Sequence, residues 1–186
     1  EDDTYSTHPK LDKRLAAIER GYNNAKNQGS NNDYSPNSST LTAEDYFYKS
    51  YDYVENGEYQ LAIDNYTKCL RLYPDDIFIT FNRGVTYYNL GNYEDAIADF
   101  TRAIRINPDY TEAYNNRGNA YDGLGSYEDA ISDYTRAIII DPDYADAYYN
   151  RGMLKENAGL SYCSDYKIGC ELGDEDCCEW YYKQCK

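Results

Sequence analysis

The sequence predicts an all-α solenoid built from repeated helical hairpins, and three observations support this fold class. The tripeptide Asn-Arg-Gly recurs every 34 residues, at 82–84, 116–118 and 150–152. Prolines recur with the same period, at 74, 108 and 142. Between these markers, aromatic and small residues return at helical spacings of three and four. A fixed period of this length is typical of supersecondary units that stack and bury their apolar faces only against their neighbours.

Each complete unit is predicted to contain two amphipathic helices. The units are residues 43–76, 77–110 and 111–144. In the third unit the first helix is expected from Thr111 to Leu124, and Gly125 supplies a permissive residue for the turn that follows. The second helix runs on towards Pro142, which ends the unit because proline cannot continue a helix.

Small residues recur at fixed positions of each unit, with a proline near its end. In the third unit they are Gly118, Ala130 and Ala137, followed by Pro142. This pattern resembles the tetratricopeptide repeat, over roughly three quarters of the chain. The resemblance implies an all-α, right-handed superhelical solenoid that binds other protein chains and carries out no catalysis.

The end of the chain departs from the repeat pattern. Residues 145–172 begin like the other units, with Tyr148 and Gly152, and then lose register. We expect them to form a degenerate fourth repeat. Residues 173–186 are expected to form a capping helix, as at the ends of many bacterial tetratricopeptide proteins. Such a cap needs a polar outer face.

Bulk properties narrow the function classes. The net charge of −15 argues against nucleic-acid binding, and no segment approaches the ~18 consecutive apolar residues of a membrane span. Motifs for nucleotide binding or hydrolysis are missing, and the single histidine is His8. We therefore expect no enzyme and no cofactor. A first residue other than Met suits a product that has lost a signal peptide. The expected location is secreted or on a bacterial surface, with the periplasm as second choice.

Five of the six cysteines lie in the last 24 residues. Facing residues of an antiparallel helical hairpin have a nearly constant sum of positions, which favours two nested disulfides around a turn at Gly173. The expected pairs are Cys163 with Cys185 and Cys170 with Cys177, and Cys178 could replace Cys177 in the inner bridge. Neither CxxC nor a histidine-containing spacing is present, so no metal site is expected. Cys69 is expected to be a core thiol, because it replaces a small residue of the repeat.

The first 42 residues do not follow the repeat. Residues 1–26 are expected to form a docking arm with a short amphipathic helix, and residues 27–42 a flexible linker rich in Asn, Ser and Thr that could carry glycans. Segment 9–26 holds five basic and two acidic residues, a balance of +3. Its apolar stripe is formed by Leu11, Leu15, Ile18 and Tyr22. The arm could cap its own first repeat or dock on a neighbouring copy, in which case the chain assembles into a filament or homo-oligomer.

The resemblance implies that the first helices of successive repeats line a groove that binds a partner chain. The residues carried over to this groove are Phe47, Tyr51, Phe81, Asn82, Val85, Asn115, Asn116, Asn119, Tyr149, Asn150 and Met153. Three of them, Asn82, Asn116 and Asn150, form a ladder of amides that could bind a peptide backbone or bond between helices. Family members grip chaperone peptides with basic groove residues. Apart from the repeated Arg83, Arg117 and Arg151, the groove positions here carry mostly Asn, aromatic and acidic residues. The expected partners are other protein chains, first of all copies of this one.

Overall fold

The computed structural model describes residues 43–186, so the predicted arm, its stripe Leu11, Leu15, Ile18 and Tyr22, and the linker lie outside the described residues. Every regular element of residues 43–186 is helical. The elements are α2 (Ala43–Glu55), α3 (Tyr59–Leu72), α4 (Ile77–Asn89), α5 (Tyr93–Ile106), α6 (Thr111–Gly123), α7 (Tyr127–Ile140), α8 (Ala145–Asn157), α9 (Cys163–Glu171), α10 (Glu175–Trp180) and the π-helical turn η1 (Tyr181–Cys185). The prediction of an all-α repeat fold is confirmed.

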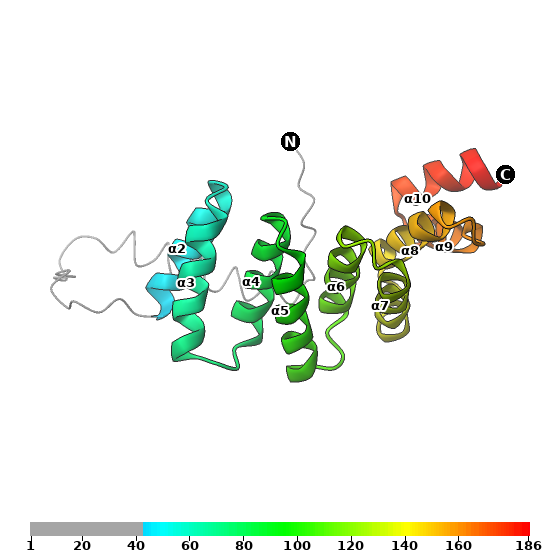
Figure 1. Cartoon of the computed structure of the whole chain (residues 1–186). Helices are drawn as coiled ribbons and strands as arrows, with labels where there is room; N and C mark the ends of the chain where they lie inside the picture. Colours follow the sequence, from blue (N-terminus) through cyan, green and yellow to red (C-terminus); the bar gives the residue numbers. More distant parts are fainter. Residues whose placement is uncertain (1–42) are drawn as a thin grey trace, which may run out of the picture. The chain divides into compact units, whose positions relative to one another are not determined.

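The helices of residues 43–186 form hairpins that follow one another in chain order (Figure 1). Four hairpins are present: α2 with α3, α4 with α5, α6 with α7, and α8 with α9. The second helix of each hairpin also packs on the first helix of the next. First helices touch as well, because α6 contacts both α4 and α8. A side of α4, α6 and α8 therefore continues from one repeat to the next.

The turn inside each hairpin depends on a glycine. Gly125 has a φ of +74°, a left-handed conformation that glycine adopts without strain. Its amide donates to the carbonyl of Asp122, and the next amide donates to the carbonyl of Tyr121. These bonds satisfy carbonyls at the end of α6 and reverse the chain into α7. Equivalent glycines occur at 57, 91 and 159.

The small residue that the sequence placed in each first helix allows close packing against an aromatic ring of the second helix. A Cβ atom added to Gly118 would lie 2.6 Å from Cε1 of Tyr134, and one added to Gly84 would lie 2.8 Å from Cε1 of Phe100. Both rings are buried. The first repeat has Ser50 at this position, fully buried, with its hydroxyl donating to the carbonyl of Tyr46 over 2.8 Å.

Two disulfides fasten the carboxyl end. The outer bridge joins Cys163 and Cys185, as expected, with 5.7 Å between their Cα atoms. The inner bridge joins Cys170 to Cys178, which corrects the expected pair Cys170–Cys177. Cys177 and Cys69 are buried and take part in neither bridge. The positions of Cys170 and Cys178 have the same sum as those of the outer pair. The constant-sum rule for facing residues therefore holds, and the expected partner of Cys170 was wrong by one residue.

The position of Cys177 in the repeat explains the correction. Helix α10 takes the place of a fifth first helix, and Cys177 is its third residue. The third residues of α6 and α8, Ala113 and Ala147, are fully buried, as Cys177 is. A Cβ atom added to Gly169 of α9 would overlap the Cys177 thiol, which shows how closely this thiol approaches α9. The sulfur of Cys177 is thereby held in the core, and the next residue reaches Cys170.

Candidate protein-binding face

The candidate binding surface is the side shared by the four first helices, α2, α4, α6 and α8, which we call the first-helix face. All of the predicted groove residues belong to these helices. Direct bonds join the face across repeats: the Nδ2 of Asn150 in α8 donates to the Oδ1 atoms of Asn115 and Asn119 in α6, over 3.1 and 3.2 Å. The hydroxyl of Tyr134 donates to the same oxygen of Asn119 over 2.8 Å. The centre of the face is therefore a connected network of amides.

The remaining members of the amide ladder bond within their own helices. The Nδ2 of Asn82 donates to the carbonyl of Phe78 over 2.9 Å, and that of Asn116 to the carbonyl of Glu112 over 2.8 Å. Both side chains are half-buried. Each of the three ladder amides is thus engaged inside the protein, and only Asn150 spans two repeats.

The predicted apolar groove residues differ in how much surface they present. Phe81 is 9% exposed and packs on Phe100 and Tyr110, with ring centroids 5.6 and 4.9 Å apart. Asn115 is 4% exposed. Phe81 and Asn115 therefore belong mainly to the core. Tyr51 is 48% exposed. The half-buried members are Phe47, Asn82, Val85, Asn116, Asn119, Tyr149, Asn150 and Met153.

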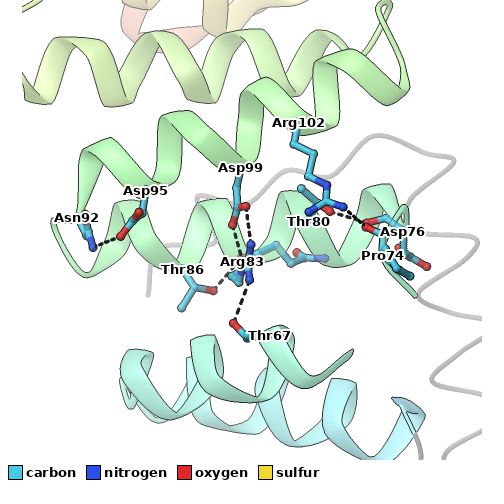
Figure 2. Close-up of polar contacts among 11 residues, drawn as sticks. Thr67, Pro74, Asp76, Thr80, Arg83, Thr86, Asn92, Asp95, Asp99 and Arg102 are labelled. Carbon is cyan, nitrogen blue, oxygen red and sulfur yellow. Dashed lines mark hydrogen bonds and ion pairs between the residues drawn. The ribbon is translucent and has the colours of Figure 1, made fainter. Parts of the chain in front are cut away.

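The arginine of each Asn-Arg-Gly tripeptide is held by the second helices on either side of it. Figure 2 shows Arg83 of α4 lying between Asp99 of α5 and Thr67 of α3. Its Nε and Nη2 donate to the two carboxylate oxygens of Asp99, each over 2.7 Å. Its Nη1 donates to the hydroxyl of Thr67 over 3.0 Å. We call this three-residue arrangement the arginine clamp.

The clamp recurs in the next two repeats. Arg117 makes the same bidentate pair with Asp133, at 2.7 and 2.8 Å, and donates to Thr101 over 3.0 Å. The hydrogen bonds and the charge of Asp133 raise the pKa of Arg117. In the fourth repeat, Arg151 and Lys155 share Asp165, and Arg151 also reaches Thr135. Bidentate pairs of this kind are among the stronger hydrogen bonds in proteins.

The clamp engages the cations of three first helices. The cations of α4, α6 and α8 are the three clamp arginines and Lys155, and each is paired with a buried aspartate. Binding a carboxylate of a ligand with any of them would strand a buried carboxylate, which is costly. The sequence pattern that could have revealed this is the spacing of 16 residues from Arg to Asp, present in two of the repeats.

The sequence prediction expected acidic residues at groove positions without naming them. They occupy the second and twelfth positions of the repeats, on the side of the helix that carries the predicted groove residues. They are Glu112, Asp122, Asp146 and Glu156. Desolvation raises the pKa of Asp122. Desolvation and the charge of Asp174 raise the pKa of Asp146. For Asp122 and Asp146, partial desolvation makes the attraction for a cation less screened than in bulk water.

Aromatic rings meet where the fourth repeat joins the cap. Tyr166 of α9 lies between Trp180 of α10 and Tyr149 of α8. Its ring is stacked on Trp180 with centroids 6.1 Å apart and an interplanar angle of 20°, and it lies 6.3 Å from Tyr149. Burial, followed by the charges of Asp176 and Asp174, raises the pKa of Tyr149. The capping helix thus contributes charge next to the last first helix.

Within residues 43–186, histidine, cysteine, aspartate and glutamate side chains nowhere gather in a group of three or more that could hold a metal ion. None of the helices described there has the length and apolarity that a membrane crossing requires.

Comparison with known proteins identifies the repeats. Residues 49–111, 81–145 and 115–159 match the tetratricopeptide repeat family. No match was found among curated protein sequences. Among solved structures, the first tetratricopeptide domain of Spaghetti (RPAP3) bound to the HSP90 peptide SRMEEVD is 30% identical, with a TM-score of 0.60, over 63% of this chain and 93% of that chain.

Two further structures share the fold. The second tetratricopeptide domain of human RPAP3, in complex with the HSP70 peptide SGPTIEEVD, is 25% identical over 59% of this chain and 92% of that chain, with a TM-score of 0.57. MamA is 22% identical over 92% of this chain and 98% of that chain, with a TM-score of 0.67. The helical hairpins, their spacing and the family match lead to one conclusion: the chain belongs to the tetratricopeptide repeat family.

Proposed function

We propose that the chain is a non-catalytic scaffold that binds a basic protein segment on its first-helix face. The observation that carries this proposal is the charge of the face. The arginines of α4, α6 and α8 are engaged in clamps, whereas carboxylates of α6 and α8 stand along the same side. A face of this kind attracts cationic segments and repels anionic ones.

The contrast with the structural neighbours sharpens the proposal. The two RPAP3 domains were solved with peptides that end in Glu-Glu-Val-Asp. A segment of that charge needs cations that are available on the face. In this chain the clamp arginines already hold Asp99, Asp133 and Asp165. We infer that acidic chaperone peptides are poor ligands here.

The preferred ligand is the amino-terminal arm of another copy. Segment 9–26 has a balance of +3 and a stripe of four apolar residues, so it offers both charge and apolar area to the face. Docking of this arm on a neighbour is heterologous, and such contacts produce a filament or ring. We propose that the chain assembles in this way outside the cell, as a structural protein of a bacterial surface.

A second candidate is a monomeric adaptor of the periplasm or cell surface that binds a foreign basic peptide. The specific observation in its favour is that the RPAP3 neighbours hold peptides of other proteins. The same acidic face serves both candidates. They differ only in the source of the basic segment.

Glycans, where the host adds them, are proposed for the linker. The sequence has one acceptor motif in the linker, at Asn37, and one in α3, at Asn65. Asn65 is 7% exposed and its Nδ2 donates to the carbonyl of Leu61 over 2.8 Å. This amide is not accessible in the folded protein, which leaves Asn37 as the candidate.

The test is the mass distribution of the non-reduced protein, by light scattering with negative-stain imaging, for the full chain and for a chain lacking residues 1–26. Self-assembly predicts large species that disappear on truncation while the helicity in circular dichroism persists. Salt should weaken the assembly, since charge attraction contributes to it. A monomer in both preparations contradicts self-assembly and leaves the adaptor.

A further inference from the structure

We propose that copies of this chain bind one another edge to edge, through a pocket on one edge of the repeat array and a turn on the opposite edge. The pocket has a volume of about 310 Å³ and is lined by Asp75, Arg102, Arg105 and Ile106. We call it the arginine pocket. Its occupant is the turn at residues 125–129 of a second copy, which we call the acidic turn. The arm takes no part in this contact, so the inference does not rest on the proposed function.

The arginine pocket carries a positive charge that is not neutralised within the described chain. Figure 2 shows Arg102 reaching from α5 to Pro74 in the turn between the first two repeats. Its Nη2 donates to the carbonyl of Pro74 over 2.7 Å and lies 3.6 Å from the Oδ1 of Asp75. Arg105 is exposed, and its side chain forms no ion pair or hydrogen bond with another described residue. The one carboxylate of the pocket is 89% exposed and offsets at most one of the two cations.

The acidic turn offers carboxylates that are ready to accept hydrogen bonds. Glu128 and Asp129 lie in the first turn of α7, and both are exposed. In the preceding repeat the equivalent carboxylate, Asp95, already accepts from the Nδ2 of Asn92 over 2.6 Å. Ser126 replaces this asparagine in the acidic turn, and Asp129 forms no side-chain hydrogen bond with another described residue. The acidic turn is therefore the better match for an unpaired arginine.

Apolar side chains accompany the charges on both edges. Ile106 lines the arginine pocket, and Leu72 and Tyr73 are exposed at the end of α3. Tyr127 belongs to the acidic turn, and Leu124 is exposed just before it. Contact between the two edges would thus remove apolar surface from water while it joins opposite charges.

The two sites lie at opposite edges, so one molecule cannot fill its own pocket. The helices α5 and α7 are both second helices of their hairpins. The arginine pocket lies at the carboxyl end of α5, and the acidic turn lies at the amino end of α7. A helix of 14 residues is about 20 Å long. Figure 1 shows the connections between repeats along one edge and the turns inside the hairpins along the other. The contact is heterologous and continues from copy to copy.

A second copy suits this pocket better than a free acidic peptide does. Exposed ion pairs contribute little by themselves, because water screens them and long side chains lose freedom. A short flexible peptide would have to rely on such pairs alone. The acidic turn is instead fixed by Gly125 and the start of α7, so its carboxylates and the Tyr127 ring are already held in place.

The experiment uses the full chain and charge reversals of exposed side chains. Arg105→Glu should raise the concentration needed for assembly about tenfold, because it replaces an attraction by a repulsion. The matched control is Arg136→Glu, on the same edge of the next repeat, where Ile139 takes the place of Arg105. This control should shift the concentration by less than about twofold. Light scattering over a concentration series measures each protein, and circular dichroism shows that each is folded.

A mixing experiment tests the pairing of the two edges. Glu128→Arg alone should weaken assembly as Arg105→Glu does. An equal mixture of these two proteins should assemble at the concentration of the parent chain, since every contact between unlike copies again joins opposite charges. The matched control mixes Arg105→Glu with Glu94→Arg, the equivalent change in the preceding turn, and should show no recovery.

Equal losses for Arg105→Glu and Arg136→Glu, or a mixture that does not recover, would overturn the inference. A parent chain that is monomeric at every concentration would overturn it as well. Deletion of residues 1–26 separates this contact from the arm. If assembly survives the deletion and still responds to Arg105→Glu, the edge contact stands and the proposed role of the arm fails. If the deletion abolishes assembly and Arg105→Glu leaves the full chain unchanged, the arm stands and the edge contact fails.

Discussion

The first repeat and the three that follow share a fold, but they are held together differently. In the later repeats a buried arginine clamp ties each first helix to the second helices on either side. The first repeat has Lys49 and Asn65 at the clamp positions; Lys49 is exposed, and Asn65 bonds within its own helix. The clamp needs a second helix on each side of the first helix. In the described residues, no second helix precedes α2.

The two ends of the described array also differ in how they are closed. The carboxyl end is covered by α10 and fastened by two disulfides. Among the described residues, the first repeat carries no disulfide. Solenoid stability is roughly a sum of repeat and interface contributions, so the difference predicts that unfolding starts at α2 and α3.

The largest expected effect comes from opening a central clamp. Arg117→Ala leaves the buried carboxylate of Asp133 without its partner and should lower the free energy of unfolding by about 3–5 kcal/mol. Lys49→Ala, at the equivalent position of the first repeat, should change it by less than about 0.5 kcal/mol, because the side chain is exposed. Urea unfolding followed by circular dichroism measures both. Equal effects would show that the clamp does not distinguish the repeats.

The disulfides of the cap come next. Replacing Cys163 and Cys185 with serine should lower the free energy of unfolding by about 2–4 kcal/mol, and the amides of α9 and η1 should exchange with solvent faster. The first repeat should keep its exchange rates, since it lies at the other end of the array. Hydrogen exchange with mass spectrometry reports both regions, and equal acceleration everywhere would mean that the array unfolds as one unit.

A smaller difference in stability is expected between substitutions of the small residue in the first helix of the third repeat and of the first repeat. Gly118→Ala brings a Cβ atom against the ring of Tyr134 and should lower the free energy of unfolding by about 1–3 kcal/mol. Ser50→Ala keeps a Cβ that the first repeat already accommodates and loses one hydrogen bond, so a decrease of about 1 kcal/mol or less is expected. Thermal unfolding compares the two variants. A greater loss for Ser50→Ala contradicts this account of the packing.

The smallest effect on stability is expected for Asp146→Asn. Desolvation raises the pKa of Asp146 in the folded protein above that in the unfolded chain, so ionisation of this carboxyl at neutral pH disfavours folding. The variant should therefore be as stable as the parent or slightly more so at pH 7. This difference should vanish below the pKa of the unfolded carboxyl, near pH 3. Melting temperatures at the two pH values test the sign. Association with a basic segment should weaken on acidification through the raised pKa of Asp146, since a neutral carboxyl attracts no cation.

The sequence alone predicted the repeat, its helices and its turns, because glycine, proline and small residues have strong and local conformational effects. The sequence also contained a pattern that indicates the arginine clamp, because Arg117 and Asp133 are separated by 16 residues, as Arg83 and Asp99 are. In the fourth repeat the aspartate arrives two residues early, at Asp165, because α9 is shorter than the other second helices.

The binding surface was harder to predict. The prediction took the apolar and amide positions from the family and noted acidic residues among them, but it did not name those residues, such as Asp146. The inner disulfide depends on which of two adjacent cysteines faces the core. Cys177 fills the buried third position of α10 and leaves the bridge to Cys178. That choice follows from the rotation of a helix that no local sequence signal defines.

The most direct test of the central claim compares two labelled peptides on the chain that lacks residues 1–26, once circular dichroism has shown it to be helical. One peptide is residues 9–26 of this protein, and the other is the acidic SRMEEVD found on the RPAP3 domain. Fluorescence anisotropy at low salt measures both affinities. The account predicts that the basic peptide binds and the acidic one does not. Tighter binding of SRMEEVD would contradict it, because an arginine would then have left its clamp to hold a ligand.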